Sequence, residues 1–418
     1  MSELKKLIKR GAQLPPKVEH LPSNYSNLGQ WKFNIWKSYL FHLFMGFHFI
    51  SGVLLPFFMT WGKLNFIEVM FLQSFFTMMI LLLEIPCGAV ADYLSRKLSL
   101  TLGAISTALA ALIYGIYPHI VIFTIGETLW AFGAALTSGS DQAFLYDTLK
   151  KLNQENKISK IMAKNRSFML LGIGISAPLG SIIAASLSLN LVMTMMVIPF
   201  FIATMISLTL KEPTQEKLKK RSTSYLKIIK DGLKQLKNNK ILRLLAVEMI
   251  ITESMVFFLI WTYQIYLEAL NVQILFYGFI SAMMTIIQII FNNLVSSIEN
   301  KINNKRRLLQ LFTIIPGVGF ISMALIFFIP ISVPLIILIV GFGFSRSIIF
   351  VKGINKQIET GSRATVLSAI NMIASLLRTL LYPVVGYLIT WNLSLSLILL
   401  GSVIIIATIL SRIKSEYL

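Results

Sequence analysis

Long apolar runs are the feature that most constrains what this chain can fold into. Residues 66–90 and 98–117, for example, are almost uninterruptedly hydrophobic. A helix of about 20 such residues spans the hydrocarbon core of a bilayer. Since 56% of the residues are hydrophobic and only 13% are charged, a soluble fold would lack the polar residues needed to cover its surface. The sequence therefore predicts an integral membrane protein.

Twelve apolar runs of this kind follow one another along the chain. We expect membrane-spanning helices at about 38–60, 66–91, 98–117, 120–146, 167–187, 191–210, 241–267, 275–298, 308–328, 333–351, 365–389 and 393–410. A long basic segment separates the first six runs from the last six, which indicates an internal repeat. The predicted fold class is an all-α membrane protein with twelve transmembrane helices in two six-helix bundles.

This division defines five regions. They are an N-terminal cytoplasmic tail at 1–37, the first bundle at 38–210, a cytoplasmic linker at 211–240, the second bundle at 241–411 and a cytoplasmic tail at 412–418. Within the linker, Tyr225, Ile229, Leu233 and Leu236 recur at helical spacing among lysines, which predicts an amphipathic helix lying against the inner leaflet. The N-terminal tail has no apolar core followed by a cleavage site, so we expect no signal peptide to be removed.

Basic residues mark one side of the membrane. The net charge is +20, and the basic residues lie in the tails, the linker and alternate loops, whereas the opposite loops contain only Lys63. This asymmetry predicts that both termini are cytoplasmic. Because membrane topology accounts for the positive charge, we expect membrane lipid rather than nucleic acid as a partner, and a monomeric chain.

The residues that several kinds of enzymatic and metal chemistry require are absent from the sequence. The single cysteine, Cys87, lies inside an apolar run, which excludes disulfides and thiolate metal sites. Neither a metal-ligand spacing, nor a phosphate-binding loop, nor a nucleophile elbow occurs, so we expect no cofactor, no metal and no enzymatic activity. A membrane-embedded transferase would need a catalytic acid, base or metal site near one interface, and no such constellation occurs in the sequence.

The most specific motif is the charged decapeptide Gly88-Ala-Val-Ala-Asp92-Tyr-Leu-Ser-Arg96-Lys97 between the second and third apolar runs. Its charges cannot lie in hydrocarbon, so we expect a tight turn. Gly88 lets the helix end approach a neighbour closely, and Asp92 can cap a helix N-terminus. The basic pair can hold the turn at the anionic membrane surface. The decapeptide resembles the loop signature of the major facilitator superfamily, Gly-x-x-x-Asp-x-x-x-Arg-Lys, which lies between the same two spans.

Two neighbouring segments extend this resemblance. Residues 84–88, Glu-Ile-Pro-Cys-Gly, look like the lead into the loop signature in many prokaryotic members. Residues 138–147 resemble a Ser-Gly-x-x-x-Ala-x-x-Tyr-Asp pattern of a drug-efflux-like branch. By that resemblance Asp147 pairs with Arg96 in one state, while Asp92 faces the start of the eleventh span. The implied gating loop consists of Gly88, Asp92, Arg96, Lys97 and Asp147, and the implied location is the cytoplasmic membrane of a prokaryote.

The sequence departs from that branch at two places. Proton-coupled drug antiporters of the superfamily usually carry an Arg in the fourth span, four residues before a Gly, and Leu129 stands at that position here. The fifth run matches the exporter signature Gly-Pro-x-x-Gly-Gly only in part, with Ala177 and Ser181 in place of two glycines. Small residues also pack helices, so this match supports export only modestly.

Polar residues inside the apolar runs are candidates for function, because charge is costly in hydrocarbon. In the second half they form stripes at helical spacing, which is typical of the wall of a wet cavity near the membrane midplane. The candidates for a proton or substrate cavity are Glu84, Glu127, Asp141, Glu253, Trp261, Gln264, Gln288, Arg346, Asn371, Arg378 and Tyr382.

Structural roles are the alternative for these residues. Glu253 and Arg378 could form an interhelical ion pair, and Glu84 could brace a proline distortion. If the arginines are not paired with glutamates, they attract carboxylate or phosphate, which favours an anionic or zwitterionic substrate. For His42 and His48, which could titrate near neutral pH, we expect hydrogen-bonded packing roles.

These patterns together predict a secondary active transporter that works by alternating access. The resemblance implies export of small amphipathic or anionic organic compounds by antiport with protons. Uptake of a metabolite, siderophore, or peptide or nucleotide conjugate is the alternative. A lipid-handling or sensor protein on a transporter fold is the alternative from another class. The candidate proton-binding carboxylates are Glu84, Glu127, Asp141 and Glu253.

Overall fold

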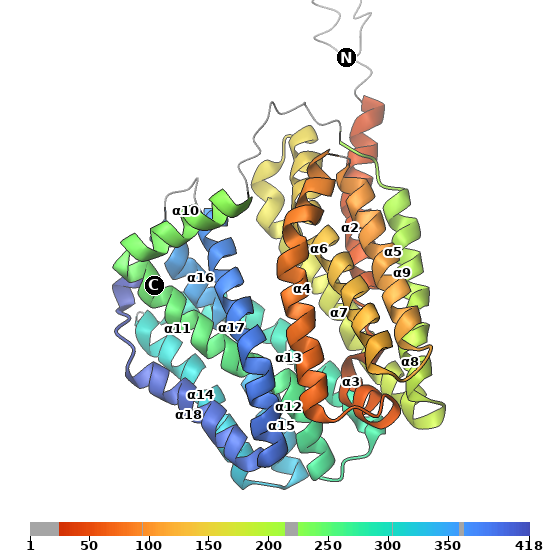
Figure 1. Ribbon diagram of the computed structural model, residues 1–418. Coiled ribbons are helices and arrows are strands. Elements are labelled where there is room, and N and C mark those ends of the chain that lie inside the picture. The colour runs from red at the N-terminus through yellow and green to blue at the C-terminus, as the bar shows by residue number, and fades with distance from the viewer. Residues whose placement is uncertain (1–24, 94, 214–224, 303, 359–362) are drawn as a thin grey trace, which may run out of the picture.

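Helices form all the regular structure of the described residues, which are 25–93, 95–213, 225–302, 304–358 and 363–418 of a computed structural model (Figure 1). Among the described residues, ten helical segments are long and apolar enough to cross a membrane. Large apolar side chains such as Ile198, Leu325 and Ile409 are more than half exposed on these helices, as expected where lipid covers the surface. The all-helical membrane class is thereby confirmed, whereas the count of twelve spans is not.

The first bundle is built from the N-terminal half of the chain. Its helices are α2 (Tyr25–Met45), α4 (Phe66–Tyr93), α5 (Arg96–Tyr114), α6 (Ile120–Lys151), α7 (Ile158–Ser186), α8 (Leu189–Met195) and α9 (Val197–Leu208). The short turn η3 (Glu155–Lys157) precedes α7, so most of residues 150–166, between the fourth and fifth predicted spans, are helical.

The predicted first span, 38–60, is not one helix. After α2 the chain forms η1 (Phe49–Gly52), α3 (Leu54–Pro56) and η2 (Phe57–Trp61). Gly46, just after α2, lies directly against α7, and a Cβ there would be 2.2 Å from the carbonyl oxygen of Met169. Glycine and proline in this stretch form helices poorly, so close packing on a neighbour decides the path of the backbone.

The second bundle is built from the C-terminal half. Its helices are α11 (Lys240–Phe257), α12 (Leu259–Ala269), α13 (Ile274–Lys301), α14 (Lys305–Leu325), α15 (Ile329–Ser345), α16 (Ser347–Lys356), α17 (Arg363–Trp391) and α18 (Leu393–Ile409), followed by η5 (Ser415–Tyr417). The predicted amphipathic helix corresponds to α10 (Tyr225–Asn238), which packs on α17 across the end of this bundle. Gly232 permits the contact, and Leu236 joins the buried core.

The two bundles share a core at one end only. There α7 packs on α13 and α4 packs on α17, and a single cluster of buried apolar side chains draws residues from both halves, including Val53, Phe57, Phe258 and Tyr277. The other buried clusters each belong to one bundle. These separate cores lie toward the end that carries α10 and the α4–α5 turn, where Figure 1 shows the bundles diverging. Below, the two ends are called the shared end and the divided end.

Candidate functional site

Arg346, at the junction of α15 and α16, is the most unusual side chain of the second bundle. It is 0% exposed, and none of its three side-chain nitrogens has a hydrogen-bond partner among the described residues. Glu248 and Glu253 of α11 lie within electrostatic range, but in the described ranges no ion pair joins either of them to Arg346. A guanidinium presents five N–H donors in a planar fork that suits carboxylate and phosphate groups. Arg346 is therefore a buried cation with unused donors.

Glu253 of α11 lies within electrostatic range of Arg346 and also of Arg378 on α17. The ion pair considered as an alternative for Glu253 and Arg378 is not observed in the described part of the chain. Glu253 Oε1 is buried without a hydrogen-bond partner there. The Arg378 guanidinium lies 4.9 Å from the ring centre of Phe257, and the rings of Trp261 and Tyr382 are 6.0 Å apart next to it. Charge and aromatic surface thus meet in one cluster.

Glu127 of α6 is a buried carboxylate whose hydrogen-bond partners are neutral donors. Gln73 of α4 donates from Nε2 to Glu127 Oε1 at 2.7 Å, and the hydroxyl of Tyr114 on α5 also bonds to it. Ser74, the residue after Gln73 on α4, donates from its hydroxyl to the carbonyl of Thr379 on α17 of the other bundle at 2.7 Å. Glu127 therefore lies in the first bundle close to its contact with α17.

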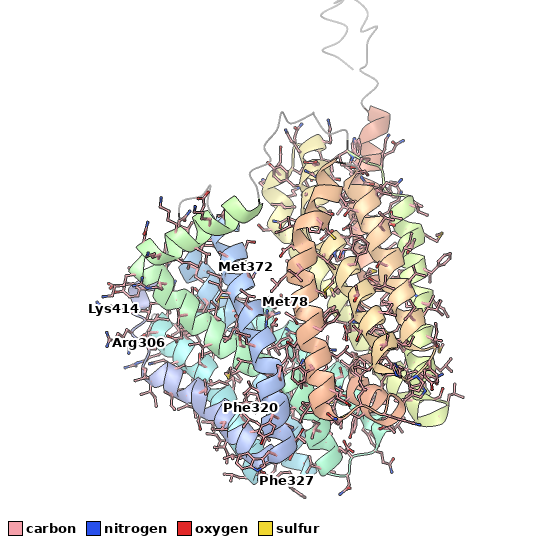
Figure 2. The ribbon with its side chains drawn as sticks, in the orientation of Figure 1. Met78, Arg306, Phe320, Phe327, Met372 and Lys414 are labelled. Atoms are coloured by element: carbon pink, nitrogen blue, oxygen red, sulfur yellow. The ribbon has the colours of Figure 1, made fainter. Side chains whose placement is uncertain are left out.

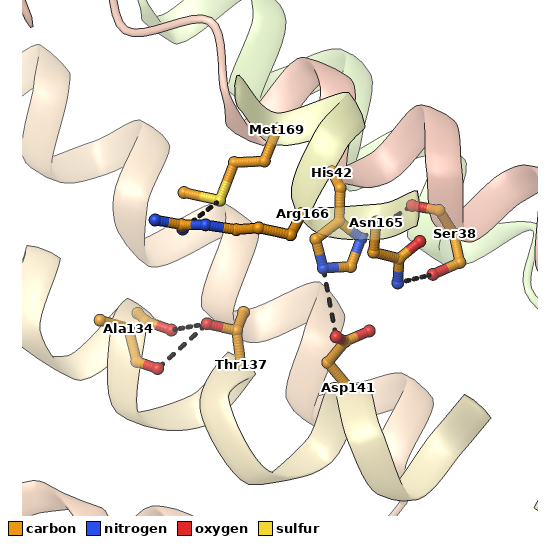
Figure 3. A network of polar contacts seen from close by, with 9 residues as sticks. Ser38, His42, Ala134, Thr137, Asp141, Asn165, Arg166 and Met169 are labelled. Atoms are coloured by element: carbon orange, nitrogen blue, oxygen red, sulfur yellow. Dashed lines mark hydrogen bonds and ion pairs between the residues drawn. The ribbon is translucent and has the colours of Figure 1, made fainter. Parts of the chain in front are cut away.

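A histidine and an aspartate form a second polar centre of the first bundle (Figure 3). His42 Nε2 of α2 lies 3.2 Å from Asp141 Oδ2 of α6, and His42 Nδ1 donates to the carbonyl of Ser38 at 2.8 Å. Asn165 of α7 donates to the hydroxyl of Ser38 at 2.9 Å, and Arg166 approaches from the same helix. The bond to the Ser38 carbonyl is compatible with the hydrogen-bonded packing role expected for His42, and the facing carboxylate of Asp141 is a partner that the sequence did not assign. Two adjacent titratable groups can share or pass a proton.

Gln264 lies in the contact between the bundles, at the shared end. Its Oε1 accepts from the backbone N–H of Leu55 at 2.9 Å, and its Nε2 donates to the carbonyl of Ser51 at 3.3 Å. The hydroxyl of Tyr263 donates to the same carbonyl at 3.2 Å. These bonds join α12 to the interrupted segment after α2. They require the bundles to touch, so they stabilise this conformation against one in which the shared end opens.

Small residues bring α7 and α13 together at the same end. A Cβ at Gly278 would lie 2.0 Å from the carbonyl oxygen of Ala177, and the hydroxyl of Ser181 donates to the carbonyl of Leu275 at 2.8 Å. Ala177 and Ser181 both stand at glycine positions of the exporter signature. In this conformation both positions pack one bundle against the other.

Charged contacts of the decapeptide lie at the divided end. Arg96 begins α5 and pairs with Asp147 of α6. Glu212, which the sequence did not single out, accepts from the hydroxyl of Ser95 at 2.8 Å and from the backbone N–H groups of Arg96 and Lys97 at 3.1 and 2.9 Å. A carboxylate at a helix N-terminus satisfies amide groups that have no partner in the helix. The only signal for Glu212 in the sequence is its position as an acid directly after the sixth apolar run.

The tight turn predicted for 88–97 needs correction. Helix α4 continues to Tyr93, so Gly88 and Asp92 are helical. A Cβ at Gly88 would meet no atom within 4 Å, because this part of α4 lies toward the divided end. The close approach expected at Gly88 is therefore absent from this conformation. The side chain of Asp92 lies outside the described residues.

The remaining cavity candidates are distributed over both bundles. Gln288 is half-buried on α13, Asn371 is exposed on α17 and Glu84 is half-buried on α4. Figure 2 places Met78 of α4 and Met372 of α17 at the level where the ribbons of the bundles begin to separate. Within the described ranges, no group of three or more His, Cys, Asp or Glu side chains is arranged to hold a metal ion.

The structure has two helical bundles that meet at one end and divide at the other, and charged side chains lie inside its apolar helices. These features are typical of a multi-pass membrane transporter. The chain belongs to the Major Facilitator Superfamily, whose sequence model matches residues 38–382. This is a family of transporters, and the membership predicted from the decapeptide is confirmed. The drug-efflux branch is not confirmed by these comparisons.

Solved structures share the fold at low sequence identity. The crystal structure of the nucleoside transporter NupG matches with a TM-score of 0.74 and 14% identity, covering 91% of this chain and 97% of that chain. A D-xylose-proton symporter matches with a TM-score of 0.73 and 13% identity, covering 93% and 99%. The POT family transporter PepTSo matches with a TM-score of 0.67 and 13% identity, covering 91% and 96%. A search of curated protein sequences finds no match.

Proposed function

We propose that this protein is a proton-coupled secondary transporter of small organic anions. The observation that carries the proposal is Arg346, fully buried with three side-chain nitrogens that have no hydrogen-bond partner among the described residues. An unpaired buried cation is unfavourable unless an anion joins it during the working cycle. A carboxylate or phosphate of the substrate would supply that partner through charge-assisted hydrogen bonds.

The surroundings of Arg378, which shares Glu253 as a neighbour with Arg346, fit a substrate that also has an apolar part. Phe257, Trp261 and Tyr382 present aromatic rings on α11, α12 and α17, and Arg378 stacks on the first of them. A planar or amphipathic organic anion would therefore place its charged group at the arginines and its apolar group against these rings. Glu253, near both arginines, would receive a proton or a cationic group of a zwitterionic substrate.

Coupling to protons would involve the first bundle. Two titratable sites lie on helices that must move relative to the second bundle during alternating access. They are Asp141 with His42, and Glu127 with its neutral donors. A change of charge at such a group changes which conformation has the lower free energy. Protonation in the first bundle and anion binding in the second would thus be linked through the contact between the bundles.

Paired ligands that differ only in charge test the substrate class. The thermal unfolding midpoint, Tm, of the purified chain would be measured with benzoate against benzamide, and with uridine monophosphate against uridine. At least one anion should raise the Tm while its neutral counterpart does not, since a ligand stabilises the state that it binds. Arg346→Met should weaken this binding about 30-fold or more, because charge-assisted hydrogen bonds are lost.

Arg307→Met provides the matched control, since Arg307 is exposed at the start of α14, whereas Arg346 is fully buried. Equal stabilisation by neutral and anionic members of every pair, or binding by Arg346→Met as tight as by Arg307→Met, would exclude an anion site at Arg346.

The sign of the pH gradient tests coupling and direction together. In proteoliposomes, proton antiport accumulates the identified anion when the lumen is acidic, whereas proton symport accumulates it when the outside is acidic. Export by antiport is the direction inferred from the sequence, and uptake by symport is a second candidate favoured by the fold likeness to a D-xylose-proton symporter.

Asp141→Asn should abolish the gradient effect, while Glu416→Gln, at a 66% exposed side chain, should preserve it. Flux that no gradient alters would exclude proton coupling, and absence of any flux would favour the lipid-handling or sensor alternative.

A further inference from the structure

A basic pocket lies at the divided end of the second bundle, away from the Arg346 cluster. Its volume is about 300 Å³, and it is lined by Glu299 of α13, Lys305 of α14, Lys352, Asn355 and Lys356 of α16, Arg363 of α17 and Leu418. Four of the lining side chains are cationic and one is a carboxylate, so their net charge is +3. Figure 2 shows two further basic residues of this bundle, Arg306 and Lys414, near its outer edge.

The carboxylate side chain of the lining already pairs with two of the lysines. Glu299 has only 6% of its side chain exposed, and its two oxygens lie 2.5 Å from Lys352 Nζ and 3.5 Å from Lys305 Nζ. Lys356 contacts Lys305, which is a like-charged group, and no ion pair among the described residues involves Lys356 or Arg363. Like charges held together at a pocket attract an anion that can neutralise both.

The corresponding place in the first bundle is already filled by an anion from the chain itself. There the carboxylate of Glu212, just beyond the sixth span, accepts hydrogen bonds at the N-terminus of α5. In the second bundle Ser415, just beyond the last helix, occupies the equivalent position and accepts from the backbone N–H of Lys305 at 3.0 Å. A neutral hydroxyl thus replaces a carboxylate at the start of α14, although more cationic side chains surround it.

Asn355 provides a second unsatisfied polar group in the lining. Its Oδ1 atom is buried and has no hydrogen-bond partner among the described residues. The oxygen and nitrogen of an asparagine amide exchange places by a simple flip, which would present an NH₂ donor at this point instead. A donor here, beside Lys356, suits an acceptor-rich ligand.

We propose that this pocket binds a phosphate group, carried by an anionic lipid or by a soluble phosphate ester, in the role that the Glu212 carboxylate plays in the first bundle. A phosphate has several acceptor oxygens and can bond to Lys305, Lys356 and Arg363 together. The pocket opens at the helix ends that the distribution of basic residues predicts to be cytoplasmic, which is the level of lipid headgroups. This proposal does not depend on the transported substrate.

Lipid titrations of the full chain in neutral detergent test the site. Dioleoyl phosphatidic acid should raise the Tm saturably, and dioleoyl phosphatidylcholine, which has no net charge, should not. The double variant Lys356→Gln, Arg363→Gln should weaken the apparent affinity about 30-fold, taking about a fivefold loss for each cationic side chain. Lys157→Gln, Lys160→Gln is the matched control, because it removes two exposed charges from the first bundle. An affinity unchanged in the pocket variant, or reduced equally in the control, would overturn the proposal.

The single variant Lys356→Glu gives an independent test. Its carboxylate would lie beside Lys305, as an internal replacement for the phosphate. The variant should have a higher Tm than the natural chain without lipid, and phosphatidic acid should raise it no further. A lower Tm together with a full response to phosphatidic acid would contradict a phosphate site.

Glycerol 3-phosphate identifies the source of the phosphate. If it raises the Tm saturably and the pocket variant loses this effect, a soluble phosphate ester is the ligand class. If only phosphatidic acid acts through the pocket residues, the ligand is a membrane lipid, since its acyl chains are then needed for binding.

Discussion

Replacing Gln264 with leucine should shift the protein away from the conformation described here. The substitution keeps the approximate size of the side chain but removes both hydrogen bonds that Gln264 makes to the other bundle. It also leaves the backbone N–H of Leu55, a residue that is only 2% exposed, without its acceptor. A net hydrogen bond contributes about 1 kcal/mol, and a buried donor left unpaired costs about 1–3 kcal/mol. The shared end should therefore lose about 2 kcal/mol, which is about 30-fold in the ratio of open to closed molecules.

Cysteine labelling measures this ratio. In a Cys87→Ala background, Ser51→Cys places a thiol where the hydroxyl oxygen is now buried, and the Ser51 carbonyl that joins the bundles is unaffected. A water-soluble maleimide should react with this thiol in proportion to the open population, so Gln264→Leu should raise the rate about 30-fold.

Gln273→Leu is the control, since Gln273 is exposed at the N-cap of α13 and makes no capping bond. If Gln264→Leu and Gln273→Leu react at the same rate as the parent, the bonds of Gln264 do not hold the bundles together and the reasoning is refuted.

Two other substitutions test contacts within the fold. Gly278→Ala should lower the Tm, because its Cβ would lie 2.0 Å from the carbonyl oxygen of Ala177 and overpacking costs about 1–3 kcal/mol. Gly174→Ala is the control and should leave the Tm unchanged, because its Cβ would be 3.8 Å from Thr285. Equal Tm values for the two variants would contradict the close packing of α7 on α13. Glu212→Gln should destabilise the chain by about 1 kcal/mol at low ionic strength and by less at high salt, as measured by Tm, because a negative charge is lost from the N-terminus of α5. A loss of stability that salt does not alter would indicate that the charge of Glu212 is unimportant.

The positions of most helices follow from hydrophobic length alone. Predicted spans at 275–298 and 393–410 correspond closely to α13 (Ile274–Lys301) and α18 (Leu393–Ile409). The reason is that a chain in hydrocarbon must satisfy its backbone hydrogen bonds internally, so every long apolar run becomes helical whatever its neighbours are. Hydrophobic length does not predict where close contact with a neighbouring helix interrupts a span. The interruption after α2 is such a case, because Gly46 lies directly against α7 there.

Sequence reasoning also selected the polar residues that lie inside the bundles, but it could not assign their partners. It considered an ion pair between Glu253 and Arg378 as an alternative, and this pair is not observed among the described residues. It also did not indicate that His42 faces Asp141 across two helices. Which charges face one another depends on the rotation and depth of each helix, and a hydrophobic pattern specifies neither when polar residues are few.

By itself, the sequence determined that this chain crosses a membrane repeatedly, that its basic residues gather in the segments between apolar runs, and that it carries the loop signature of the Major Facilitator Superfamily. Only the tertiary structure decided which end of the bundles is shared, that Arg346 is buried without a hydrogen-bond partner among the described residues, and that Gln264 joins the bundles. The physical reason is that burial in lipid acts on each segment separately, whereas these contacts arise between segments far apart in the chain and depend on how whole helices pack.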